Sequence, residues 1–127
     1  MPTVLTVGKK SWGKGMDYWV GAAHRVARVR PDVRFLWVGP GRLPVRRPYL
    51  DDAGPLAHSA MPAVYGLADL VVHPSLMEAR PRAITEARPG CPVVATAVGG
   101  VPEIPGLHLV PPADPVALAE AILRWLP

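Results

Sequence analysis

Short apolar runs and amphipathic runs alternate along the chain. Residues 3–8 (TVLTVG), 33–39 (VRFLWVG) and 69–75 (DLVVHPS) are rich in β-branched and apolar residues, which is typical of strands buried on both faces. CPVVATAVGG, residues 91–100, and GLHLVPP, residues 106–112, have the same character and each ends near glycine or proline. The pattern therefore predicts five buried strands.

The segments between these strands show helical spacing. Residues 17–30 predict a helix that ends before Pro31, with Arg25 and Arg28 on its polar face and an apolar face formed by Trp19, Ala22, Ala23, Val26 and Val29. Residues 60–68 predict a short helix with Pro62 in its first turn. A second short helix is expected at about 82–88, between Pro81 and Pro89.

The last helix has a clear start signal. Asp114 is its predicted N-cap and Pro115 its first residue, and the apolar stripe consists of Leu118, Ala121, Ile122 and Trp125. Residues 42–59 contain several prolines and no usable period, so a loop is expected there.

Strands that alternate with helices predict a doubly wound, Rossmann-like α/β domain with a parallel sheet covered on both faces. Ligands of such sheets bind beyond the carboxyl ends of the strands. Four polar or glycine-bearing segments follow predicted strands: the lysine loop 9–15, the turn 39–41, residues 73–81 and residues 98–103. The sequence therefore predicts a binding site at one edge of the sheet.

Composition limits the class of protein. At 127 residues, with 50% hydrophobic and 19% charged residues, the chain is expected to form one globular domain. No apolar run approaches the roughly 20 residues of a membrane span, so no integral membrane segment is expected. A single cysteine, Cys91, excludes an internal disulfide and favours a reducing, cytoplasmic location.

The net charge of +4 leaves three classes of anionic partner open: a nucleic acid, a membrane surface or a small anionic ligand. All three lysines (Lys9, Lys10 and Lys14) lie within six residues, whereas the eleven arginines are scattered. This distribution favours a local anion over a long polyanion.

Two glutamates, Glu78 and Glu86, are separated by seven residues in an arginine-rich stretch. A nucleotide sugar needs carboxylates for its hydroxyl groups, and it needs cations and backbone N–H groups for its diphosphate. Carboxylates beside cations therefore suit such a ligand. The alternative is that both glutamates are solvated and pair with neighbouring arginines.

The segments VGKKSWGKG, WVGPGR, YGLADLVVHPSLMEARPRAITEA, GCPVVATAVGGVPE and LVPPADPVALAEAI occur in this order. Together they resemble the C-terminal, nucleotide-sugar-binding domain of retaining GT-B glycosyltransferases of glycosyltransferase family 4, over nearly the whole chain except about residues 42–57. The resemblance implies that residues 1–127 form a single donor-binding domain, one half of a GT-B enzyme. It also implies that the N-terminal acceptor domain is absent and would come from another domain or partner chain.

The resemblance further implies roles for individual residues. Lys9 and Lys14 would contact the donor diphosphate and stabilise the leaving group, and Glu78 would face the transferred sugar. The remaining implied binding residues are Glu86 at the ribose, Gly39 and Gly41 near the nucleoside, and the backbone of Arg82 and Ala83 at the phosphate. Lys10 is expected to be a solvated neighbour. No cofactor and no metal are implied, because the lysines supply the charge of a divalent cation.

The sequence also departs from the family. Ala79 and Pro81 stand where the family has glycines, and the step from Glu86 to Gly90 is one residue short. Between residues 41 and 65, where the family inserts a helix and a further strand, no such strand is recognisable. On its own, such a domain is expected to bind a nucleotide sugar weakly and to transfer nothing.

Two other classes of function stay open. The first is a non-catalytic interaction module that keeps the fold without the ligand. The second is a nucleic-acid-binding domain that uses Arg42, Arg46 and Arg47, although no aromatic residues are interleaved with these arginines. His73 has no neighbouring ligand at metal-binding spacing, and Glu103 is expected to brace its loop.

Overall fold

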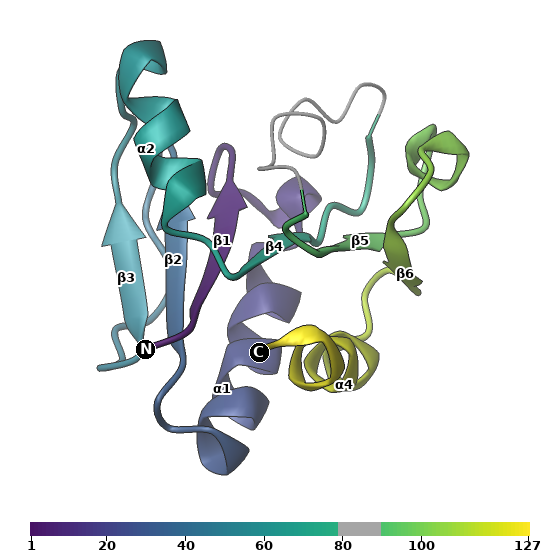
Figure 1. The fold of residues 1–127 in the computed structure, drawn as a ribbon, viewed down its shortest axis with the longest axis horizontal. Helices are drawn as coiled ribbons and strands as arrows, with labels where there is room; N and C mark the ends of the chain where they lie inside the picture. Colours follow the sequence, from purple (N-terminus) through teal and green to yellow (C-terminus); the bar gives the residue numbers. More distant parts are fainter. Residues whose placement is uncertain (79–89) are drawn as a thin grey trace.

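The structure is a computed structural model that describes residues 1–78 and 90–127. Its centre is a parallel sheet of six strands in the order β3-β2-β1-β4-β5-β6 (Figure 1). The strands are β1 (Thr3–Val7), β2 (Arg34–Val38), β3 (Leu50–Ala53), β4 (Leu70–His73), β5 (Val93–Thr96) and β6 (His108–Val110). The order runs outward in both directions from β1 and β4, so these two strands form the topological switch point of a doubly wound sheet. The predicted Rossmann-like fold is confirmed.

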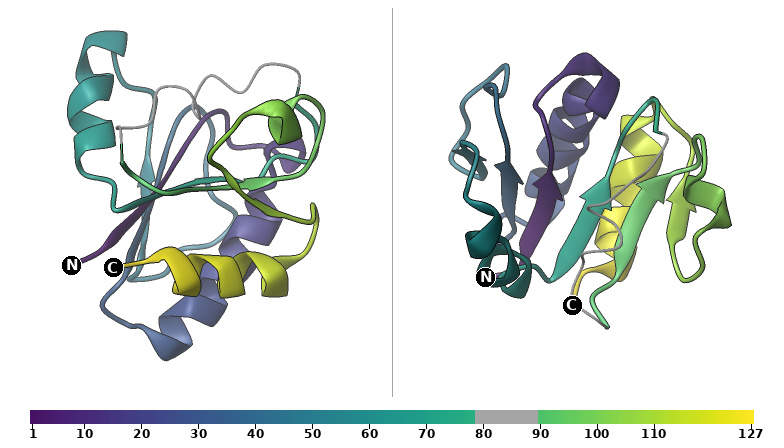
Figure 2. Two further views of the ribbon diagram at one scale, coloured as in Figure 1. Left: turned by 45° about the vertical axis from the view of Figure 1, so that its right-hand side comes forward. Right: turned by 90° about the horizontal axis from the view of Figure 1, so that it is seen from above.

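Helices cover both faces of the sheet. Helices α1 (Met16–Val29) and α4 (Pro115–Trp125) pack against each other on one face. The short α2 (Met61–Gly66) lies on the opposite face, as the view from above shows (Figure 2). The core beneath α1 and α4 contains Trp19, whose ring meets Phe35 and Trp37 edge-on at 5.7 and 5.2 Å between centroids. The prediction that Trp19 is a core residue is therefore confirmed.

The predicted start and stop signals act where expected. The side chain of Asp114 accepts a hydrogen bond of 2.9 Å from the Ala117 N–H and caps α4, with Pro115 at its first position. Helix α1 ends at Val29, two residues before Pro31. None of the helices within residues 1–78 and 90–127 is long and apolar enough to cross a membrane.

The segment 42–59, predicted to be a loop, contains the edge strand β3 and the start of a 3₁₀ turn, His58–Ala60. This prediction was wrong because Asp51 and Asp52 occupy the middle of β3 and hide any apolar pattern. Both carboxylates are matched by cations: Arg34 donates to Asp51 through Nε and Nη2, and Lys10 pairs with Asp52. An edge strand exposes one side to water, so paired charges are tolerated there.

Two residues of the predicted apolar stripes are exposed. Val29, in the last turn of α1, is 66% exposed, and Trp125, at the end of α4, is 37% exposed. Terminal turns extend past the elements on which the helix packs, and helical spacing alone does not show this. Trp125 instead stacks on His108 at 3.5 Å between ring centroids. The short helix predicted at about 82–88 lies outside the described residues.

Candidate functional site

The loops that follow β1 and β4 meet at the switch point of the sheet. The N–H of Leu76 donates to the carbonyl of Gly13 at 2.9 Å, which joins the two loops. Gly15 sits at the junction with φ 77°, and a Cβ there would lie 1.9 Å from the carbonyl oxygen of Pro74. Only glycine permits this approach, so Gly15 allows the Lys14 loop to lie directly against the end of β4.

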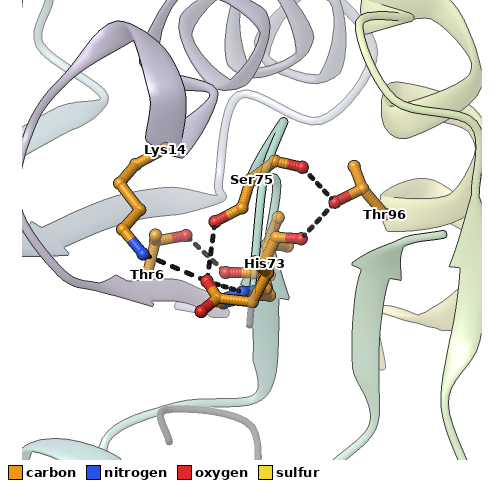
Figure 3. Close-up of polar contacts among 7 residues, drawn as sticks. Thr6, Lys14, His73, Ser75 and Thr96 are labelled. Carbon is orange, nitrogen blue, oxygen red and sulfur yellow. Dashed lines mark hydrogen bonds and ion pairs between the residues drawn. The ribbon is translucent and has the colours of Figure 1, made fainter. Parts of the chain in front are cut away.

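Glu78 is the centre of a polar cluster at this junction, which also contains Lys14, His73 and Ser75 (Figure 3). Its Oε2 accepts from Lys14 Nζ at 3.0 Å, from His73 Nε2 at 3.0 Å and from Ser75 Oγ at 3.4 Å. The Glu78 side chain is 8% exposed, whereas Lys14 remains 37% exposed. The structure therefore brings together two of the residues singled out from the sequence, and it leaves the Lys14 side chain accessible to solvent.

Threonine hydroxyls on the neighbouring strands hold the end of β4. Thr96 Oγ1 on β5 donates to the carbonyl of His73 at 3.3 Å and also contacts that of Ser75, and Thr6 Oγ1 on β1 donates to Val72 at 2.8 Å (Figure 3). Both threonines are buried. These hydrogen bonds fix the backbone that carries His73 and Ser75, and with it the two side chains that contact Glu78.

The ionisation of the cluster follows from burial and charge. Burial would raise the pKa of Glu78, but the hydrogen bond and charge of Lys14, helped by His73, outweigh it and lower the pKa. For His73, burial lowers the pKa more than Glu78 raises it, and Lys14 lowers it further. At neutral pH the cluster therefore holds an ionised Glu78 and a neutral His73.

Lys9 and Gly39 lie beside a separate cavity of about 300 Å³. Lys9 is exposed at its edge, and Leu56, His58 and Met61 form part of the lining. Gly39 packs on the loop after β1, since a Cβ there would lie 1.8 Å from the carbonyl oxygen of Gly8. The glycine turn thus holds the loops after β1 and β2 together at the rim of this cavity. Gly41, two residues on, lines a different hollow.

Lys10 is not the solvated neighbour that the sequence predicted. Its side chain is fully buried, and Nζ donates to the carbonyls of Gly39 at 2.6 Å and of Ala53, and pairs with Asp52 at 2.9 Å. The charged group therefore ties together the ends of β1, β2 and β3. Its partners Ala53 and Asp52 come from the segment predicted to be a loop, so no pattern in the sequence indicated this role.

Several predicted residues fall elsewhere. Glu86, Arg82 and Ala83 lie outside the described residues. Glu103 is exposed at the end of the 3₁₀ turn Val101–Glu103. No group of three or more histidine, cysteine, aspartate or glutamate side chains in the described part of the chain could hold a metal ion.

Sequence reasoning assigned no role to His73 and Ser75, which contact the Glu78 carboxylate. One signal was available, since both residues lie at the end of a buried strand and precede Glu78 by five and three positions. Side chains at the carboxyl end of a switch-point strand are well placed to reach the adjacent turn.

Comparison with known proteins places this fold in a family. The profile of the family "Glycosyl transferases group 1" matches residues 1–127. Among solved structures, a sucrose-phosphate synthase from Thermosynechococcus elongatus is 33% identical with a TM-score of 0.75, covering 97% of this chain and 35% of that one. The C-terminal domain of a glycosyl transferase group 1 family protein from Francisella tularensis is 21% identical with a TM-score of 0.83, covering 97% and 74%. These structural neighbours are GT-B glycosyltransferases.

Relatives with curated names are also glycosyltransferases. A phosphatidylinositol N-acetylglucosaminyltransferase subunit from Arabidopsis thaliana is 33% identical over 93% of this chain, and the gpi3 subunit of the enzyme of the same name from Schizosaccharomyces pombe is 29% identical over 89%. The chain spans 28% and 27% of the lengths of these two relatives. Because the family profile extends over every residue of the sequence, the chain belongs to the glycosyl transferases group 1 family.

Proposed function

We propose that this chain is the donor-binding domain of a retaining glycosyltransferase of family 4 and binds a nucleoside diphosphate sugar at the edge where β1 and β4 end. The observation that carries the proposal is the contact between Lys14 and Glu78 at the switch point of the sheet. A phosphate-binding cation and a hydroxyl-binding carboxylate are side by side there. A related Anabaena protein, 26% identical with a TM-score of 0.78, was solved in complex with UDP-glucose, which supports a ligand of this class.

The hydrogen-bonding groups that the cluster leaves unused suit this ligand. Lys14 donates one N–H to Glu78 and keeps two for phosphate oxygens. Oε1 of Glu78 makes no hydrogen bond with any described residue, so it can accept a hydroxyl of the transferred sugar. In the proposed reaction the bond from the anomeric carbon to the diphosphate breaks. The acceptor oxygen bonds to that carbon on the same face, and its proton passes to the leaving phosphate oxygen.

The other residues of the site are assigned to the diphosphate and to the nucleoside. Lys9 and Lys14 stabilise the charge that develops on the leaving diphosphate, so no metal ion or cofactor is required. The 300 Å³ cavity beside Lys9 and Gly39 suits the nucleoside. The family resemblance implies the remaining contacts. We assign the ribose hydroxyls to Glu86 and the phosphate to the backbone of Arg82 and Ala83. The turn that contains Gly39 and Gly41 is assigned to the nucleoside.

The acceptor site of a GT-B enzyme belongs to its other Rossmann-like half. We therefore expect residues 1–127 alone to bind the donor and to transfer nothing until an N-terminal domain or partner chain completes the cleft. We also infer a cytoplasmic location, which the single cysteine favours.

Calorimetric titration with UDP, GDP and ADP, with and without magnesium, tests the proposal. We expect one nucleotide to bind without magnesium and binding to be lost in a Lys9→Ala/Lys14→Ala variant. The matched control is Arg25→Ala/Arg28→Ala on the exposed face of α1, which removes the same charge away from the site. Equal loss in both variants, a strict need for magnesium, or no binding to the folded protein would overturn the proposal.

A further inference from the structure

A second hollow lies beside the edge strand, next to the proposed donor site, with which it shares Gly41. It measures about 870 Å³ and is lined by residues 41–47, Leu50, Asp52 and Gly54. Leu50 packs against the core beneath α1, and Asp52, two residues on, points to the same face of the strand. The cavity beside Lys9 instead includes Met61 of α2. The two cavities share no lining residue and adjoin at the turn 39–41.

The residues that line the hollow carry an excess of positive charge. Arg42, Arg46 and Arg47 line it, and none of them forms an ion pair with a described residue. The nearby carboxylates are already engaged. Asp51 pairs with Arg34, and Asp52 pairs with Lys10 while it accepts the Leu43 N–H at 2.8 Å. Three arginines therefore share one hollow with a single lining carboxylate, Asp52, which feels the charge of Arg42 but is paired with Lys10.

The loop that carries these arginines is held in place. Leu43 is buried and anchors the loop to the core, and its N–H is fixed by Asp52. At the other end, Arg34 Nη1 donates to the carbonyl of Pro48 at 2.6 Å, and the Leu50 N–H donates to the carbonyl of Arg47 at 3.0 Å. A cationic loop that is fixed before a ligand arrives loses little conformational entropy on binding.

We propose that this hollow is a binding site for a phosphate-bearing ligand, distinct from the cavity assigned to the nucleoside of the donor. Guanidinium groups match phosphate oxygens in bidentate geometry, and the volume of the hollow is that of a small-molecule site. A polynucleotide is disfavoured because no exposed aromatic side chain in residues 41–54 offers a stacking surface. The inference does not depend on the proposed donor site.

The test is an NMR titration of the ¹⁵N-labelled protein with inorganic pyrophosphate at low salt. We expect the amide signals of residues 42–47 and 52–54 to shift together. The affinity should fall about tenfold in Arg42→Ala/Arg46→Ala, since each lost charge-assisted contact weakens binding by a severalfold factor. The control Arg25→Ala/Arg28→Ala loses the same net charge and should change the affinity less than about twofold. Shifts at residues 8–15 would report the donor site separately.

Two further arms identify the source of the phosphate. Binding to a lipid headgroup is measured by co-sedimentation with phosphatidylglycerol vesicles and compared with co-sedimentation with phosphatidylcholine vesicles. If the same two arginines are required there and pyrophosphate binds weakly, the ligand is a lipid phosphate. The proposal is overturned if neither probe depends on Arg42 and Arg46, or if both double variants weaken binding equally. It is also overturned if a single-stranded oligonucleotide binds far more tightly than pyrophosphate through the same arginines.

Discussion

Lys10 offers the sharpest test of how this sheet edge is built, through the substitution Lys10→Met. Methionine keeps most of the apolar stem and removes the ammonium group. The change leaves the carbonyls of Gly39 and Ala53 without their donor and removes the partner of Asp52 at 2.9 Å. Because these acceptors lie at the ends of β2 and β3, the substitution should loosen the frame that carries the glycine turn.

The magnitude follows from the burial of the partners. Breaking a buried ion pair by removing one partner costs roughly 3–5 kcal/mol. The side chain of Asp52 is 35% exposed and can be rehydrated, so the lower end of this range applies. We expect a loss of about 3 kcal/mol in the free energy of unfolding. With a urea dependence of about 1.5 kcal/mol/M, the unfolding midpoint should fall by about 2 M.

Urea unfolding followed by tryptophan fluorescence measures this loss. The matched control is Lys9→Met, in which the exposed neighbouring lysine undergoes the same chemical change; its cost should stay within about 0.5 kcal/mol. A second control, Asp52→Asn in the Lys10→Met background, should cost little more, because the pair is already broken. A difference between the two lysine variants below about 1 kcal/mol would refute the account of Lys10 as a buried tie.

Two further predictions concern the junction between the β1 and β4 loops. Burial lowers the pKa of His73 below its ordinary value of 6.5, so below pH 6.5 the unfolded chain binds a proton that the folded chain does not. Stability from this residue is therefore complete above pH 6.5 and falls as the pH drops. His73→Gln should flatten the dependence of the unfolding midpoint on pH between about pH 7 and about pH 5. An unchanged slope in this variant would contradict the assignment. Gly15→Ala should cost at least about 2 kcal/mol in urea unfolding, because its Cβ would meet the Pro74 carbonyl at 1.9 Å. Gly66→Ala, with open space around it, should be neutral or slightly stabilising, and equal costs at the two glycines would refute the packing argument.

The elements that the sequence predicted correctly are those whose signals are local. Apolar runs such as residues 3–8 need no partner to be recognised as buried strands, and Asp114 followed by Pro115 marks a helix start by short-range chemistry alone. Strand β3 has no such signal. Its two central aspartates are stable in a sheet only because Arg34 and Lys10 pair with them, and this pairing depends on the tertiary fold.

Within the candidate site, too, some residues could be predicted from the sequence and others could not. The rule that ligands bind where parallel strands end brought the Lys14 loop and Glu78 to one edge, and the structure joins them at 3.0 Å. His73 and Ser75 were missed because their role is to contact Glu78, and a contact between side chains of a strand end and its turn leaves no periodic pattern. The roles of Glu86, Arg82 and Ala83 stay predictions.

The three lysines show why a charge cluster does not define a site by itself. Within six residues, Lys9 is exposed beside a cavity, Lys10 is buried among carbonyl groups, and Lys14 is half-buried against a carboxylate. All three N–H groups of Lys10 already have acceptors, so Lys10 can donate to a ligand only if its contacts with Gly39, Ala53 or Asp52 break. A diphosphate that reaches this loop therefore meets Lys9 and Lys14 alone among the lysines, on either side of one whose role is structural. If Lys10→Met weakens nucleotide binding, it should do so only as far as the loss of stability explains. Lys14→Gln also removes the partner of a buried carboxylate, so it should cost stability too, but it should weaken binding by more than that loss explains.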